Sequence, residues 1–210
     1  MPPRSLLPVS LLLLTLATGA VNAIAFLALG GVFSSVMTAN LGLIGLSAAS
    51  RDAMLAMQSA LALAGFAVGV PIGSRFTAAG FRWAGARGAL AAELVILCGV
   101  LAGWAALGGE PHGGARHALL AASAMAMGCQ SGTVQVTGPA GMSTTFVTGS
   151  LTQVIGDVAT GTFRAGQALL ILMLPLGALL GGLAVIHARQ AAPAVPAAFV
   201  AAALASTWRT

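Results

Sequence analysis

Residues 164–186 read RAGQALLILMLPLGALLGGLAVI, and after Arg164 this stretch carries no charged side chain. Apolar residues would cover all faces of a helix built from it, not just one stripe. A helix of that kind lies either deep in a protein core or against lipid. Because about 20 mostly apolar residues are enough to cross a bilayer, the stretch predicts a membrane-spanning helix.

The rest of the chain has the same character. Of its 210 residues, 58% are apolar and only 6% are charged, whereas a soluble domain carries about a quarter charged residues. A chain this short has too little core to hide several such helices, so lipid is the expected solvent. The basic residues are scattered, which argues against a nucleic-acid partner. Cys98 and Cys129 are expected to be free thiols in the core.

Six spans are predicted, which makes the chain an all-α, multi-pass membrane protein with a single domain over residues 1–210. The sixth is short and begins with two prolines. An alternative for the first is a cleaved signal peptide ending near Val21-Asn22-Ala23, although apolar sequence continues to Leu29. The predicted spans are Leu6–Gly30, Met54–Gly73, Gly88–Gly108, His117–Thr137, Arg164–Ile186 and Ala192–Trp208.

The basic residues near the span ends predict the orientation. With the N-terminus inside, six arginines fall on the cytoplasmic side and three outside. The positive-inside rule therefore favours cytoplasmic termini. The bias depends mainly on the loop with Arg75, Arg82 and Arg87.

Two connections are apolar yet rich in hydroxyl and amide groups. They are Val32–Gly45, between the first two predicted spans, and Ser143–Asp157, between the fourth and fifth. At an offset of about 110 residues they align, with Ser34-Ser35 on Thr144-Thr145 and Thr38 on Thr148. Gly69-x-x-x-Gly73 and Gly177-x-x-x-Gly181 keep a similar offset.

These matches predict two repeats, approximately residues 1–110 and 111–210. Three spans per repeat place the second half upside down, the inverted-repeat architecture of many secondary transporters. Irregular backbone survives at membrane depth only when it is buried in protein or lines water. We therefore expect both connections to be broken or re-entrant segments that meet near the midplane. The glycine pairs are expected to allow close helix packing, including contacts in a homo-oligomer.

Such segments would present hydroxyls and helix N-termini to a small polar or anionic solute. The alternative is that the hydroxyls only bond to their own helices or join helices together. Gly19 in the first predicted span and Gly128 in the fourth also match at a similar offset. The amides of Asn22 and Gln130, which follow these glycines, are expected to support the site. The candidate solute-binding residues are Thr38, Asn40, Thr144, Thr145, Thr148 and Ser150, with Asn22 and Gln130.

Two acids are candidates for a coupling charge. Glu93 lies about six residues inside the third predicted span, where an ionisable group is a functional candidate. The alternative to a functional role is that Glu93 lies at the membrane interface and pairs with Arg87. Asp157 ends the second hydroxyl-rich connection, where it faces the same cavity or caps the next span. Neither a catalytic set nor metal-ligand spacing is present in the sequence, so no enzyme activity, metal or cofactor is expected.

Several of these motifs together resemble the YoaK family of small bacterial inner-membrane proteins, a domain of unknown function. The resemblance covers nearly the whole chain, and the Thr-Gly-containing motif is its most specific part. The motifs are Gly19–Ala23, Gly31–Phe33, Met37–Leu41, Met127–Gln130 and Ser143–Thr152.

The chain departs from the family pattern at three places. In the family an Asp is common at the position of Asn22, a Gly at Ala39, and an Asn-Ala pair at Ser131-Gly132. The missing acid at position 22 weakens proton coupling through that site. The family implies a membrane location but no activity.

The residues favour a small secondary transporter or permease. The rival is a non-transporting scaffold or accessory subunit, whose Gly-x-x-x-Gly faces would bind partner helices.

Overall fold

The computed structural model describes residues 8–78, 82–138, 144, 147–161 and 165–208. Within these ranges the chain forms eight α-helices and one 3-10 turn, without strands. They are α1 (Pro8–Ala28), α2 (Met37–Ser50), α3 (Ala53–Ala78), α4 (Arg82–Ala106), α5 (Gly113–Thr137), α6 (Val147–Ala159), α7 (Ala165–His187), η1 (Arg189–Ala191) and α8 (Ala194–Ser206). The all-α prediction is confirmed.

Four helices, α1, α3, α4 and α7, are long and apolar enough to cross a membrane. The other two predicted spans also coincide with helices, α5 and α8. Helix α5 has 25 residues but is less apolar, and much of it is buried among its neighbours. A helix shielded by protein does not need a lipophilic surface on every face. Helix α8 has only 13 residues and follows Pro193 at its N-cap.

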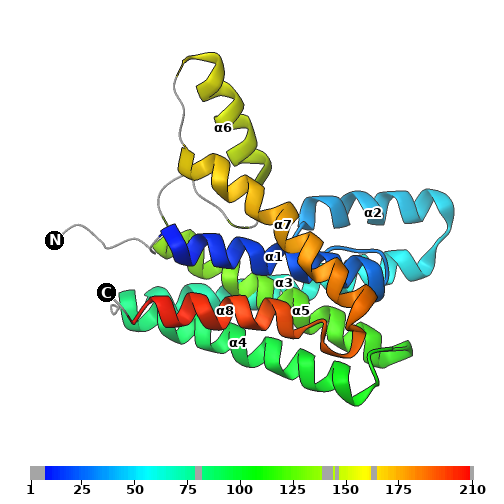
Figure 1. Ribbon diagram of the computed structural model, residues 1–210. Coiled ribbons are helices and arrows are strands. Elements are labelled where there is room, and N and C mark those ends of the chain that lie inside the picture. Colours follow the sequence, from blue (N-terminus) through cyan, green and yellow to red (C-terminus); the bar gives the residue numbers. More distant parts are fainter. Residues whose placement is uncertain (1–7, 79–81, 139–143, 145–146, 162–164, 209–210) are drawn as a thin grey trace.

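The bundle in Figure 1 has two ends, and a hydrogen bond at each identifies the helices that meet there. Near the start of α1, the Ser10 hydroxyl lies 2.8 Å from that of Ser206 at the end of α8. We call this the terminal end. At the opposite, distal end, the Trp104 indole near the end of α4 donates to the Arg189 carbonyl at 2.7 Å. Both ends of the described chain therefore lie on the same side of the bundle.

Two parallel helix pairs, α3 with α5 and α1 with α7, are packed through glycines. A Cβ atom built on Gly69 would lie 2.0 Å from the Met125 carbonyl oxygen, and one on Gly177 would lie 2.1 Å from that of Leu16. Close backbone approach of this kind requires glycine. The prediction of close packing is confirmed within the chain.

The same glycines were predicted to make contacts in an oligomer. Gly73 lies against Cys129, and Gly181 lies against Ala20 of the same chain. Both glycines therefore serve packing within the chain, and an oligomeric contact stays a prediction.

The two shorter helices, α2 and α6, lie outside these pairs. Helix α2 packs along α3, and α6 packs against α7 and projects away from the bundle (Figure 1). Helix α6 exposes an apolar stripe of Leu151, Ile155 and Val158.

The central core contains large side chains from α1, α4 and α5, including Leu14, Leu90 and Met127. Cys129 belongs to this interior, as predicted, but Cys98 is exposed on the outside of α4. The prediction for Cys98 was wrong because an apolar sequence does not show which helix face meets lipid.

The Arg87 side chain binds the last residues after α8, at the terminal end of the bundle. Arg87 of α4 donates to the hydroxyl and the carbonyl of Thr207, and its guanidinium lies 4.5 Å from the centre of the Trp208 ring. We expect Arg87→Ala to lower the free energy of unfolding by about 1–2 kcal/mol, because a cation–π contact and two hydrogen bonds are lost. Thermal unfolding in detergent measures the change. Arg75→Ala, at an exposed position, is the matched control, and equal shifts would contradict the assignment.

Candidate functional site

The chain between α1 and α2 turns back along α1. Gly30 and Gly31 have φ angles of +126° and +74°, which permit the turn. Residues 29–36, the first loop segment, then return to the level of Asn22. Because Asn22 lies six residues before the end of α1, the segment reaches about 9 Å back along that helix.

Asn22 holds this segment through one side-chain amide. Its oxygen accepts hydrogen bonds from the backbone N–H groups of Ser34 and Ser35 at 3.1 and 3.0 Å and from the Ser34 hydroxyl at 3.1 Å. Its nitrogen donates to the Ser35 hydroxyl at 2.7 Å. All three residues are buried. The amide thus satisfies polar groups that would otherwise be unpaired in an apolar interior.

Asn40, in the first turn of α2, holds the same segment from the other side. Its nitrogen donates to the Phe33 carbonyl at 2.6 Å, and its oxygen accepts from the Phe33 N–H at 3.1 Å. The side chain is fully buried. The amide groups of both asparagines predicted to bind solute are therefore hydrogen-bonded to the first loop segment.

Gln130 of α5 makes the corresponding contact in the second half of the chain. Its nitrogen lies 2.9 Å from the Thr144 hydroxyl, 2.8 Å from the Thr18 hydroxyl and 3.2 Å from the Leu14 carbonyl. The Gln130 oxygen is buried and has no hydrogen-bond partner among the described residues. Of the second loop segment, residues 138–146, the structure describes Gly138 and Thr144.

The two amide contacts lie one helical turn apart on α1. Thr18 touches Gln130, and Asn22 follows Thr18 by four residues, which is about 6 Å along the helix. The first loop segment comes in from the distal end, where α1 finishes. Thr144 comes in from the terminal end, because α5 runs parallel to α3, whose last turn packs against the start of α4 at Gly85.

The other predicted solute-binding residues are not gathered into one site. Thr38 is exposed on α2, whereas Ser150 is buried on α6. Thr145 lies outside the described residues, and Thr148 is placed only as a position in α6.

The two acids predicted to carry a coupling charge lie in different environments. Glu93 is fully buried on α4, with neither carboxyl oxygen bonded to a described residue. The alternative of an Arg87 pair is wrong, because Arg87 binds Thr207 and Trp208. Asp157 is half-buried in the last turns of α6, a helix that packs against α7. The structure does not bring the two acids together.

A groove of about 510 Å³ lies beside the first amide contact, between α1, α7 and the first loop segment. Asn22 is the one polar side chain among its described lining, and the Phe26 and Phe33 rings stack at 5.3 Å within it. Such a groove offers few hydrogen-bond partners for a polar solute.

Comparison with known proteins identifies the family. A family model described as "Protein of unknown function (DUF1275)" matches residues 10–206. The chain belongs to this family. It is 33% identical to the "UPF0700 transmembrane protein YoaK" of Bacillus subtilis (strain 168) over 158 residues, or 74% of this chain and 68% of that protein. No solved structure matches.

The family resemblance inferred from the motifs is thereby confirmed. With a transmembrane relative and four helices able to cross a bilayer, this DUF1275 protein is a membrane protein.

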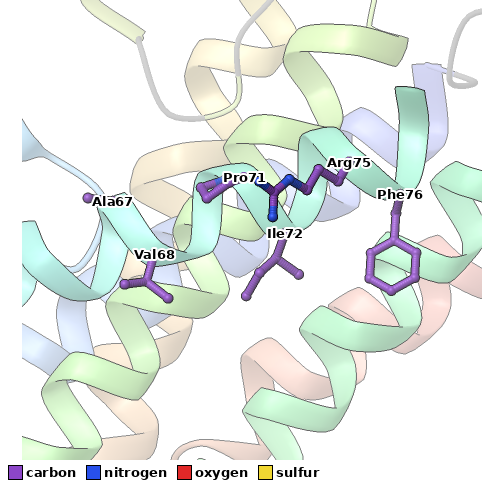
Figure 2. Close-up of a pocket in the computed structure, with 6 residues that line it drawn as sticks. All are labelled: Ala67, Val68, Pro71, Ile72, Arg75 and Phe76. Atoms are coloured by element: carbon purple, nitrogen blue, oxygen red, sulfur yellow. The ribbon is translucent and has the colours of Figure 1, made fainter. Parts of the chain in front are cut away.

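A second surface hollow of this DUF1275 protein, about 740 Å³, lies along the outer face of α3. Figure 2 shows the Arg75 side chain lying back toward Pro71, while Ile72 and Phe76 project from the same helix on another side. None of the predicted site residues is among its described lining, so it does not extend the candidate site.

Sequence reasoning missed two residues that support the site, Thr18 and Gln58. Thr18 lies one turn before Asn22, and this four-residue spacing would have placed both on one face. Gln58 gave no sequence signal. With its amide oriented to satisfy both atoms, it donates to the Gly30 carbonyl at 2.8 Å and accepts from Arg116 at 2.7 Å. This contact fixes the turn that starts the first loop segment.

Proposed function

We propose that this protein crosses the membrane six times, as two inverted repeats. Equivalent glycine contacts in the two halves support the proposal. Gly69 against Met125 corresponds to Gly177 against Leu16, and Gly73 against Cys129 corresponds to Gly181 against Ala20. Gly128 against Phe66 likewise corresponds to Gly19 against Leu174. Each pair is related by an offset of 108 or 109 residues.

The loop regions support the same repeat. Asn22 with Ser34 corresponds to Gln130 with Thr144, and the left-handed residue after α2, Arg51, corresponds to Gly161 after α6. An odd number of crossings per half reverses the second half relative to the first. With six arginines against three, the positive-inside rule then places both termini in the cytoplasm.

We further propose that the protein is a secondary transporter or permease for a small polar or anionic solute. One observation carries this proposal, namely the pair of amide contacts that hold loop segments coming from opposite ends of the bundle. Release of one contact at a time would open the centre to one side and then to the other, as alternating access requires.

The present conformation is then a closed state. A solute entering after release would meet the N-terminus of α2 and a set of hydroxyls. These belong to Thr38, Thr144, Thr145, Thr148 and Ser150. In this proposal Asn22, Asn40 and Gln130 hold the closed segments and exchange these bonds for bonds to solute.

Flux through purified protein in liposomes tests the transport proposal. The panel would contain polyols, zwitterions, short carboxylates and inorganic anions. We expect flux of at least one class, and a loss of about tenfold or more in Gln130→Leu. Ser50→Ala, at an exposed position near the end of α2, should match wild type. Equal flux in wild type and in a Thr38→Val, Thr148→Val double variant would remove these two hydroxyls from the path. Absence of flux for the whole panel would contradict a transporter of this class.

The rival proposal is a membrane scaffold. It is favoured by the fact that Asn22, Asn40 and Gln130 all hydrogen-bond to other parts of this chain. Cysteine labelling separates the two readings in a background with Cys98→Ser and Cys129→Ala. In a transporter, a membrane-impermeant thiol reagent should reach Ser35→Cys from the distal side and Thr144→Cys from the terminal side. Ala126→Cys, in the core, is the unreactive control. Protection of both positions from both sides would favour the scaffold.

A further inference from the structure

Glu93 lies near the middle of the bundle, not at its edge. Helix α4 begins at Arg82, so Glu93 is about 17 Å along it, with a similar length remaining to Ala106. Its side chain has no exposed surface. The sequence placed it near a span end because the predicted span began at Gly88.

Among the residues that the structure describes, none supplies a counter-ion to Glu93. On α5 the facing titratable group is Cys129, whose thiol contacts the Ala89 carbonyl, one turn before Glu93 on α4, at 3.5 Å. Helix α8 contains no titratable residue. On α3, Arg75 is exposed on the outer face, and on α4 itself Arg87 is bound at the end of the chain.

An ionised carboxylate in such a place would be very costly. A charge buried without hydrogen bonds or a partner is strongly disfavoured, and the group takes up a proton instead. A metal cation is also a poor match. Hard cations need about six oxygen ligands. Among the described residues Glu93 is the one carboxylate at this place in the bundle, and the carbonyls of the surrounding helices are already bonded within those helices.

We propose that Glu93 is a proton-binding site, neutral in this closed conformation, and that the proton is the coupling ion of the transporter. The second clause rests on the proposed function, whereas the first does not. The proton leaves only when water reaches the carboxyl, because the anion needs solvation.

The structure also links this site to the loop contacts. Cys129, whose thiol contacts the Ala89 carbonyl one turn before Glu93, and Gln130, which binds Thr144, are consecutive residues of one turn of α5. A movement of this turn of α5 away from α4 that hydrates Glu93 would also displace the Gln130 amide from Thr144. In the proposed transporter, proton release at Glu93 and loss of this hydrogen bond would then occur together.

Infrared spectroscopy of the protein in lipid tests the proton site. At neutral pH we expect a carbonyl stretching band of a protonated carboxylic acid in an apolar setting, which shifts slowly in deuterated water. The band should be lost in Glu93→Gln and kept in Glu110→Gln, an exposed acid beside Arg189. A spectrum without this band, or a band that survives in Glu93→Gln, overturns the proposal.

Labelling of the wild-type protein gives a second measurement that needs no variant. A hydrophobic carbodiimide attacks protonated carboxyls in apolar surroundings, and mass spectrometry locates the adduct. We expect modification of Glu93 by this reagent and not by a water-soluble carbodiimide. A failure to modify Glu93, or equal modification by both reagents, contradicts a buried proton site.

The outcomes separate the two proposals. Infrared and labelling signals at Glu93 without flux of any tested solute would leave the proton site standing and remove the transporter. Solute flux that is unaffected by a pH gradient, together with a protonated Glu93, would overturn the proton as coupling ion while keeping the transporter.

Discussion

Gly73→Val is expected to prevent the bundle from assembling. A Cβ atom at Gly73 would lie 2.0 Å from the Cys129 carbonyl oxygen and 2.9 Å from the Thr133 nitrogen. Because both are backbone atoms of a helix, neither can move without separating α3 from α5. The cost is expected at or above the upper end for overpacked cores, about 3 kcal/mol. Size-exclusion chromatography and thermal unfolding in detergent measure the loss of folded protein.

Gly99→Val provides the matched control. Gly99 lies in α4 with no atom within 4 Å of the position its Cβ would take. The same substitution should leave stability within about 0.5 kcal/mol, since valine has a slightly better helix propensity than glycine. Similar losses at the two positions would show that the effect does not arise from the α3–α5 contact.

Asn22→Ala is expected to release the first loop segment. The change leaves the N–H groups of Ser34 and Ser35 and their hydroxyls without the amide that binds them. Each unpaired buried group costs about 1–3 kcal/mol, and partial access of water reduces the sum, so we expect a total of about 3–5 kcal/mol. Hydrogen exchange at residues 33–36 should become faster, and the unfolding temperature should fall.

Asn22→Asp is the variant that separates loss of the contact from loss of packing. A carboxylate accepts hydrogen bonds from the two N–H groups and the Ser34 hydroxyl, and the Ser35 hydroxyl can turn to donate to it, so we expect the loop to keep its slow exchange. Fast exchange in both variants, or slow exchange in both, would show that the hydrogen bonds of residue 22 do not hold the segment.

The sequence predicted the helices well because the signal for an apolar helix is local. Each predicted span coincides with one helix, the sixth at Ala194–Ser206, and four of the helices are long and apolar enough to cross a membrane. The match between the two glycine pairs also predicted real contacts. Their neighbours, however, were not predictable, because spacing alone does not tell a helix of the same chain from one of a second copy.

The candidate site was predicted in part. Asn22, Asn40, Gln130 and Thr144 were recognised as polar groups at membrane depth, and each is buried. Their partners were not foreseen, because hydrogen bonds such as that between Gln130 and Thr18 join residues far apart in the chain. The pairing of Glu93 with Arg87 was wrong for the same reason. Both lie on α4, but Arg87 reaches the end of α8.

The sequence by itself determined that this protein is a membrane protein and where its helices run. These properties follow from local composition. Only the tertiary structure decided which helices touch, that Asn22 and Asn40 bind the chain itself, and that Glu93 has no partner among the described residues. Hydrogen bonds and close backbone contacts depend on distances between segments, and those distances exist only after the helices have packed.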